Sequence, residues 1–414
     1  MLICFPNIGI KSFQLKYEYF CCLINLHFVN CILYIINCIR MKKPPTPFPV
    51  TGYFGPAYFC DRREELDQLT RNIRGGNPTT LTALRRLGKT ALIHHLFHQL
   101  RSEYITIYMD ILPTESLGDM LDRFSTAMAS QYSERSKLGR SVWRMIKSLR
   151  PVISYDPLSG TPQVFIRSAP DESRKTMTEL FQVLEEQSKP VVIAIDEFQQ
   201  ILEYPEKQTE AWLRSVMQQL RNTTFIFSGS QQHLMKDMFT NPEKPFFRST
   251  QFMKIGKLEE SIYRDFIVKQ YRKHSRSISD ETVTEMLRWT DLHTYYVQLL
   301  CNRVFLSPDK EITTGIWKEE AARILKEQEF VFYGYREMLT KSQWDLLKAV
   351  AREGRVYQPT SSDFISGHAL GNPSSVLRSL QSLQKMELVY RENDREGHSY
   401  YGIYDVLFGR WVAR

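Results

Sequence analysis

One segment constrains the fold more than any other. A short β-prone run at residues 79–83 leads through a loop into Gly88-Lys89-Thr90, and an apolar-faced helix is expected over 90–100. Apolar residues in that helix recur three and four positions apart, which is the helical period. A second strand over 104–109 and a second helix over 116–132 follow. Strands that alternate with helices in this way predict a parallel sheet, so the expected fold class is α/β.

The loop contains the residue types that a phosphate-binding loop requires. Such a loop needs backbone N–H groups that converge on anionic oxygens, a cation for the terminal phosphates and a hydroxyl for magnesium. Gly88 lets the backbone pass close to phosphate, Lys89 would reach the β- and γ-phosphate oxygens, and Thr90 would ligate Mg²⁺. The other loop residues expected to contact the nucleotide are Arg86, Leu87 and Ala91.

One position departs from the usual phosphate-loop pattern. The pattern has a glycine five residues before Gly88, where this chain has Ala83. Alanine resists positive φ, so a loop that requires such a dihedral would be strained there, whereas a β or helical backbone would accept alanine. Because Gly-Lys-Thr often arises by chance, a helix start with a surface lysine is the competing interpretation.

A second segment, the strand expected over 191–195, supports the interpretation of Gly88-Lys89-Thr90 as a phosphate-binding loop. The apolar run over 191–195 ends in Asp196-Glu197, and runs without polar alternation are typical of strands buried on both faces. Asp196 would then lie at the C-terminal edge of the sheet, where such folds bind ligands. Asp196 would position magnesium and Glu197 would activate the attacking water, although an acidic helix cap after a buried strand is the alternative. A further run, 225–231, ends in small polar residues that fit either a γ-phosphate sensor or a turn.

Length and pattern divide the rest of the chain. At 414 residues it exceeds what one hydrophobic core usually serves. We expect a P-loop core over 41–258, with an inserted hairpin between residues 134 and 170. A helical lid without strands is expected over 259–338. The order in 339–414 is helix, helix, helix and two short strands with Gly397 in the turn, which predicts a winged-helix domain.

These elements together resemble the prokaryotic AAA-type ATPases of the signal-transduction P-loop class, in particular the archaeal-type ATPase family with a C-terminal winged helix. The resemblance extends from about Phe59 to Arg414. The segments that carry it are 59–66 (FCDRREEL), 84–90 (LRRLGKT), 195–198 (IDEF) and a closing motif at 404–411 (YDVLFGRW).

The resemblance implies ATP and Mg²⁺ as ligands of this chain. It implies nucleotide binding by the Gly88-Lys89-Thr90 tripeptide, magnesium positioning by Asp196, water activation by Glu197 and a place for Arg62 near the adenine. Two further departures are Asp61, where glycine is frequent, and Asp291-Leu292-His293 in place of a glycine-containing lid turn. For an arginine finger the candidates are Arg221 and Arg248, with a surface role as the alternative for each.

The winged-helix segment contains the candidate surface for a macromolecular partner. Asn372-Pro373 opens the expected recognition helix, in which Val376, Leu377, Leu380 and Leu383 face inward. The residues expected to face outward are Arg378, Gln381, Gln384 and Lys385. These types suit DNA contact, but they equally suit a solvated helix, and winged helices also bind proteins. A net charge of +8 is compatible with nucleic acid without deciding the question.

The first forty residues differ in composition from the rest. They hold five of the seven cysteines and are almost free of acidic residues. Three interpretations stay open: a non-native extension that precedes a start at Met41, a membrane anchor over residues 20–39, or a disordered tail. With only Cys60 and Cys301 in the remainder, we expect a reduced, cytoplasmic protein without a zinc site, and a membrane role only if the anchor is real.

Three functional hypotheses follow from the sequence. The first is an ATP-driven switch whose lid and winged helix move with hydrolysis, with self-association possible. The second is a nucleotide-independent DNA-binding or scaffold protein whose phosphate loop has decayed, for which Ala83 would be the first sign. The third is an origin-recognition-like or mobile-element helper ATPase, whose DNA binding would strengthen with ATP.

Overall fold

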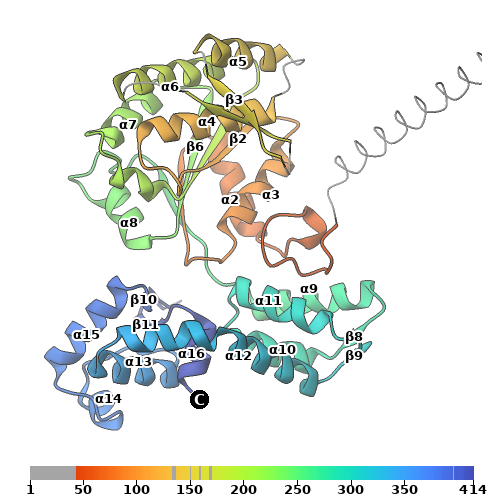
Figure 1. Ribbon diagram of the computed structural model, residues 1–414, viewed down its shortest axis with the longest axis vertical. Coiled ribbons are helices and arrows are strands. Elements are labelled where there is room, and N and C mark those ends of the chain that lie inside the picture. Colours follow the sequence, from red (N-terminus) through yellow and green to blue (C-terminus); the bar gives the residue numbers. More distant parts are fainter. Residues whose placement is uncertain (1–42, 133–136, 150, 158–159, 167–169, 395) are drawn as a thin grey trace, which may run out of the picture. The chain divides into compact units, whose positions relative to one another are not determined.

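The structure is a computed structural model that describes residues 43–132, 137–149, 151–157, 160–166, 170–394 and 396–414 (Figure 1). Phe48–Arg414 forms one compact unit. The interpretations given for residues 1–40 lie outside the described residues. Within the described ranges, no helix combines the length and the apolar character needed to cross a membrane.

A five-stranded parallel sheet forms the centre of the first half of the chain (Figure 1). Its order is β2-β5-β6-β1-β7. The strands are β1 (Thr79–Thr82), β2 (Ile105–Asp110), β5 (Val191–Asp196), β6 (Thr223–Gly229) and β7 (Gln251–Lys254). Because all five strands are parallel, their carboxyl ends share one edge of the sheet. The expected α/β core is confirmed, and β7 is an edge strand that the sequence pattern did not reveal.

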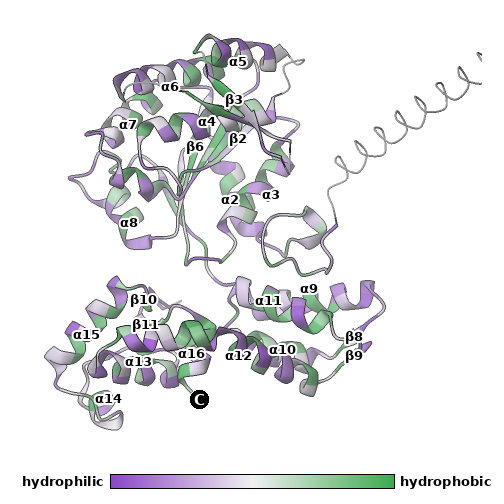
Figure 2. Ribbon diagram, viewed as in Figure 1, coloured by the Kyte–Doolittle hydropathy of each residue, from purple (hydrophilic) through white to green (hydrophobic). Residues whose placement is uncertain are grey.

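Helices cover both faces of this sheet. Along β5, Ile193 and Ile195 belong to one apolar cluster while Val192 and Ala194 belong to another, which explains the unbroken apolar run. Figure 2 shows the central strands β2 and β6 in green, the colour of hydrophobic residues. The helices around the sheet are α2 (Arg63–Arg74), α3 (Lys89–Leu100), α4 (Leu117–Gln131), α6 (Pro170–Glu185), α7 (Thr209–Gln219) and α8 (Gln232–Thr240). Two 3₁₀ helices, η1 (Pro56–Tyr58) and η2 (Phe198–Glu203), complete this half of the chain.

The insertion between α4 and α6 contains the expected antiparallel hairpin, formed by β3 (Val152–Tyr155) and β4 (Pro162–Phe165). It also contains α5 (Lys137–Ser148), which the sequence suggested only as a basic stretch. The apolar side of α5 includes Val142 and Ile146, both fully buried. Arg140, Arg144 and Lys147 lie among the apolar positions of α5, so the sequence pattern suggested a basic stretch and not an amphipathic helix.

The region expected to form the lid is mainly helical, as predicted, with α9 (Glu260–Lys273), α10 (Asp280–Trp289), α11 (Thr294–Phe305) and the long α12 (Thr314–Met338). The expectation that it contains no strand is wrong. Two short strands, β8 (Ser277–Ile278) and β9 (Glu311–Ile312), pair in parallel. Strands of two residues are too short to show a period of two in the sequence.

The C-terminal segment has winged-helix order. It contains α13 (Lys341–Glu353), α14 (Ser362–Gly367), α15 (Pro373–Lys385), the antiparallel pair β10 (Val389–Asn393) and β11 (Ser399–Ile403), and a closing helix α16 (Val406–Val412). A capping box of Thr340 and Gln343 begins α13, and the Asn372 side chain caps α15. Gly397 has φ +90° in the turn, which glycine alone adopts readily.

Candidate nucleotide-binding site

The phosphate loop begins α3 in the way the sequence predicts. Gly88 is the N-cap residue of α3 with φ 97°, and no side chain caps this helix end. The first N–H groups of α3 are therefore not satisfied by a cap, which favours an anion at this position. Ala83 is fully buried and does not have a positive φ. The residues of the loop that do are Arg86, with φ 63°, and Gly88. Alanine therefore fits this loop without backbone strain.

Lys89 is a buried cation at the start of α3. Its side chain is among the buried polar groups, and its ammonium makes no hydrogen bond or ion pair that involves the described residues. Burial lowers the pKa of Lys89, while the Glu197 and Asp196 carboxylates act in the opposite direction. A buried ammonium without a direct partner suits an anionic ligand at this position.

Asp196 lies at the carboxyl end of β5 and accepts two side-chain hydrogen bonds on the same oxygen. The Thr90 hydroxyl donates to its Oδ2 at 2.7 Å, and the Tyr108 hydroxyl donates to the same atom at 2.9 Å. Asp196 is buried, with only 3% of its surface exposed. The two residues that the sequence assigns to magnesium, Thr90 and Asp196, are therefore in direct contact.

Glu197 follows Asp196 with a left-handed backbone, φ 54°. Its Oε2 accepts hydrogen bonds from the Ser230 hydroxyl at 2.7 Å, the Ser230 backbone N–H at 3.2 Å and the Gln199 side chain at 2.7 Å. Ser230 directly follows β6, where the sequence suggested a sensor or a turn. These donors fix the orientation of the Glu197 carboxylate.

A third carboxylate, Asp110, was missed in the sequence. It ends β2 and lies beside Asp196 in the parallel register. Burial raises the pKa of Asp110, and Asp196 and Glu197 add to the effect, although a hydrogen bond from the Leu112 backbone N–H acts in the opposite direction. The sequence did show an acidic residue at the end of the strand predicted over 104–109. That this residue lies beside Asp196 follows only from the order of the strands in the sheet.

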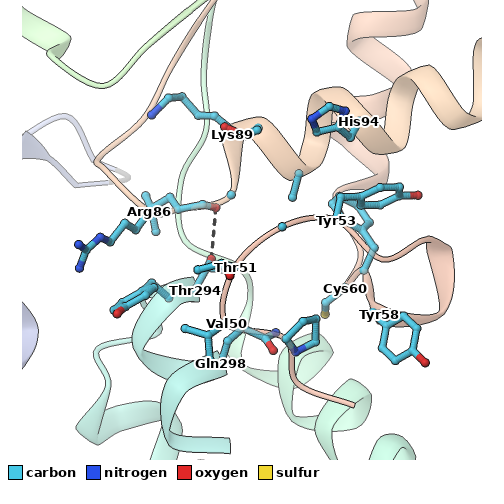
Figure 3. A pocket seen from close by; sticks show the side chains of 18 of the residues that line it. Val50, Thr51, Tyr53, Tyr58, Cys60, Arg86, Lys89, His94, Thr294 and Gln298 are labelled. Carbon is cyan, nitrogen blue, oxygen red and sulfur yellow. Dashed lines mark hydrogen bonds between the residues drawn. The ribbon is translucent and has the colours of Figure 1, made fainter. Parts of the chain in front are cut away.

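A cavity of about 740 Å³ opens beside the phosphate loop (Figure 3). It is within the range of about 300–1,000 Å³ that is usual for small-molecule sites. Residues 49–60 form one wall, in which the Tyr53 ring stacks on His94 of α3 at a centroid distance of 6.3 Å. Figure 3 shows these two rings together, on the opposite side of the cavity from Arg86. Burial raises the pKa of Tyr53 to about 12, so its hydroxyl stays protonated.

The loop carbonyls and side chains are held from outside the loop. The Leu87 carbonyl accepts hydrogen bonds from Arg62 at 3.4 Å and from the Thr294 hydroxyl at 3.3 Å (dashed line in Figure 3). The Arg86 guanidinium lies 4.5 Å from the centre of the Tyr295 ring. Arg62 is buried and pairs with Glu65 at 2.7 Å, so its nearest contacts are with the loop and the start of α2.

The cavity brings together most of the predicted site residues. Its lining includes the predicted residues Arg62, Arg86, Leu87, Gly88, Lys89, Thr90, Ala91 and Glu197. Asp196 lies behind Thr90 and contacts it directly. The two arginine-finger candidates, Arg221 and Arg248, are not part of this lining.

The parallel sheet, the Gly-Lys-Thr helix start and the Asp-Glu pair at the end of β5 define the class of P-loop NTPases. Residues 59–300 match the family described as "ATPase domain predominantly from Archaea", and residues 330–414 match "Probable winged helix domain". The first match covers more than half of the chain. The chain therefore belongs to this archaeal-type ATPase family, as the sequence resemblance indicated.

Solved structures show the same fold. The Walker-type ATPase of Pyrococcus abyssi is 16% identical with a TM-score of 0.61, and the alignment covers 89% of this chain and 100% of that protein. The ORC2 protein of Aeropyrum pernix, solved as ADPNP–ADP complexes, is 11% identical with a TM-score of 0.59, with 90% and 96% coverage. No curated protein matches the sequence.

Proposed function

We propose that this chain binds ATP and acts as a Mg²⁺-dependent ATPase, working as a molecular switch coupled to its winged helix. The observation that carries the proposal is the convergence of Lys89, Thr90 and Glu197 on one cavity, with Asp196 against Thr90. The ATPase family match and the ADPNP–ADP complexes of the Aeropyrum pernix relative support ATP as the ligand. We propose domains at 41–258, 259–338 and 339–414.

The residues around the cavity fit a nucleoside triphosphate. Lys89 and the uncapped start of α3 would hold the phosphates, because both present positive charge to the same space. Mg²⁺, for which Thr90 and Asp196 would be the holding residues, would supply charge neutralisation at the phosphate oxygens. The wall that contains Tyr53, Phe54 and Tyr58 would receive the base.

Glu197 is the residue that we assign to water activation. Ser230 and Gln199 donate to one of its oxygens, which fixes the carboxylate plane and leaves the other oxygen for a water molecule. Phosphoryl transfer depends mainly on positioning and charge neutralisation, and one oriented base meets the requirement for the nucleophile. Ser230 therefore acts as a positioning residue for Glu197.

The coupling to the winged helix rests on direct contacts with the phosphate loop. The Arg85 guanidinium pairs with Glu387 at 2.9 Å, and the Arg85 backbone N–H donates to the Tyr404 hydroxyl at 2.9 Å. Arg410 of the closing motif donates to the carbonyls of Arg288 and Trp289 at 2.8 Å each. A ligand that moves the phosphate loop would thus bias the position of the winged helix.

The winged helix is the proposed module for DNA or a partner protein. We place the protein in the cytoplasm, which agrees with the free, buried thiols of Cys60 and Cys301. Self-association would allow Arg221 or Arg248 to serve a neighbouring copy. The rival hypothesis of a decayed phosphate loop relied on Ala83, and the unstrained backbone at Ala83 weakens it.

The test of this proposal separates ATP binding from turnover. Glu197→Gln keeps a hydrogen-bonding side chain but removes the base, so we expect ATP affinity near that of the wild type with turnover reduced about a hundredfold or more. Calorimetric titration and phosphate release measure the two quantities. A matched control is Glu203→Gln, at the end of η2 and outside the cavity lining. Full turnover in the Glu197 variant would remove Glu197 from the mechanism.

A further inference from the structure

A second groove lies between the ATPase core and the winged helix, with a volume of about 1110 Å³. Its core side comes from residues 230–236, which include the start of α8, and from β7. Its winged-helix side comes from the C-terminal half of α15 and from β10. We propose that this groove binds single-stranded nucleic acid. This inference names a partner for the proposed function. It rests on one part of that function, the role of the winged helix as the binding module.

The charge of the groove favours an anionic ligand. Lys236, Lys385 and Arg391 line it, and none of them has an ion-pair partner within the described ranges. The two carboxylates in the groove are already paired, Glu387 with Arg85 and Glu392 with Lys254. The remaining charge is therefore positive, and it comes from both walls. A phosphate backbone that runs between the walls would meet cations on each side.

Polar side chains that can contact base edges line the same groove. Gln381 and Gln384 of α15 face the start of α8 across the groove, where Gln231 and Gln232 are located. The Nε2 of Gln232 is buried and has no hydrogen-bond partner in the described part of the chain. A buried amide without a partner carries a desolvation cost that a ligand acceptor would offset. Amide side chains of this kind donate to and accept from base edges.

One wall also offers an aromatic surface. Phe252 of β7 lines the groove with 41% of its surface exposed. Bases stack on exposed aromatic rings irrespective of sequence. Cations, amides and an exposed ring in one groove are the combination that a single strand requires.

The position of α15 distinguishes a single strand from a duplex. A winged helix usually inserts its recognition helix into the major groove of duplex DNA, but here Gln381, Gln384 and Lys385 face the ATPase core instead. Arg378, in the N-terminal half of α15, is exposed and outside the groove. The volume exceeds the usual upper limit of about 1,000 Å³ for small-molecule sites, which fits an extended ligand.

The groove is also connected to the proposed catalytic centre. Ser230 lines both the groove and the nucleotide cavity, and its hydroxyl donates to Glu197. Glu387 lines the groove and pairs with Arg85 of the phosphate loop. A strand in the groove would therefore contact elements that hold both the loop and Glu197, and we expect it to change the rate of ATP turnover.

The test uses the full chain and fluorescence anisotropy with labelled oligo-dT and oligo-U of about 15 nucleotides and a duplex of the same length. Salt is varied between about 50 and 200 mM. We expect both single strands to bind more tightly than the duplex. The double variant Lys236→Glu/Lys385→Glu should weaken single-strand binding and lower the slope of log Kd against log salt by about 1.4, at about 0.7 for each phosphate that is no longer neutralised. Phe252→Ala should weaken binding about tenfold.

Two controls make this result specific. Lys326→Glu/Lys341→Glu makes the same change in charge at exposed positions outside the groove and should bind as the wild type does. Unchanged single-strand affinity in Lys236→Glu/Lys385→Glu would overturn the proposal, as would duplex binding that depends on Arg378 and not on Lys236. ATP titration of the wild type and the same variants separates the single-strand proposal from the ATPase proposal. A wild-type protein that binds oligonucleotide but not ATP would refute only the ATPase proposal.

Discussion

The backbone N–H of Arg85 in the phosphate loop donates to the hydroxyl of Tyr404, 319 positions further along the chain, at 2.9 Å. Tyr404 begins the closing motif that follows the wing. Its neighbour Asp405 caps α16 through the N–H groups of Leu407 and Phe408, and Arg410 binds the end of α10. The motif thus connects the winged helix to α10 and to the loop of the proposed nucleotide site.

Removal of this hydrogen bond should weaken nucleotide binding. In Tyr404→Phe the ring remains and the hydroxyl is absent, so the Arg85 N–H has no acceptor and the loop becomes less ordered before ATP binds. A hydrogen bond of this kind contributes about 0.5–1.5 kcal/mol, or about two- to tenfold in Kd. Calorimetry with ATP measures the change. Tyr401→Phe, in β11, is the matched control, and equal affinities in the two variants would contradict the assigned role.

Restoration of the missing glycine should not improve the site. Ala83 is fully buried and outside the positive-φ region, so Ala83→Gly removes a buried methyl group and adds flexibility to the unfolded chain. We expect a loss of about 1–2 kcal/mol in stability and no gain in ATP affinity. Thermal unfolding and ATP titration measure the two effects. If the glycine variant bound ATP much more tightly, the phosphate loop of this chain would have to be regarded as decayed.

Tyr108 should set the magnesium requirement. Its hydroxyl and that of Thr90 donate to the same Asp196 oxygen, so Tyr108 can keep Asp196 in place when Thr90 turns to a metal ion. Loss of such a supporting hydrogen bond typically costs about tenfold or more in metal affinity. We expect Tyr108→Phe to raise the Mg²⁺ concentration for half-maximal turnover by that factor, while Tyr104→Phe leaves it unchanged. An unaltered magnesium dependence in Tyr108→Phe would show that Asp196 needs no such support.

His293 should make stability depend on pH. It is buried at the start of α11, and burial, together with Lys257, lowers its pKa to about 4. The unfolded chain takes up the proton near pH 6.5, before the folded protein does, so stability is full above pH 6.5 and declines as the pH falls towards 4. The expected loss by pH 5 is about 2 kcal/mol.

The variant His293→Asn tests this assignment, because asparagine also begins helices well but has no charge to gain. Thermal unfolding at pH 7 and pH 5 should show a smaller acid-induced shift for this variant than for the wild type. Identical shifts would assign the pH dependence to other groups.

The sequence allowed the prediction of those parts of the fold whose signals are local. The apolar run of β5 identified a strand that is buried on both faces, and the helical period of α3 identified the helix after the phosphate loop, which is buried on one face. The pair of β8 and β9 left no pattern, since two residues cannot show a period. The helix α5 was not recognised because basic residues, Arg140, Arg144 and Lys147, lie among its apolar positions.

In the candidate site, too, a local motif identifies some residues and only the fold identifies others. Lys89, Thr90, Asp196 and Glu197 could be named in advance, because a motif fixes their order along the chain. Asp110 could not, because its place beside Asp196 depends on the pairing of β2 with β5. Nor could the role of Tyr404, whose hydrogen bond with Arg85 joins segments far apart in the chain.

The most direct measurement is a calorimetric titration of ATP with and without Mg²⁺ into the wild-type protein and Lys89→Ala. The wild type should bind ATP, and more tightly with Mg²⁺ present. Lys89→Ala should weaken binding by about a hundredfold or more, because a buried cation that faces the phosphates is removed. Lys326→Ala, on the exposed surface of α12, controls for the removal of a charge. Equal ATP affinity in the Lys89 variant and the wild type would contradict the nucleotide site described above.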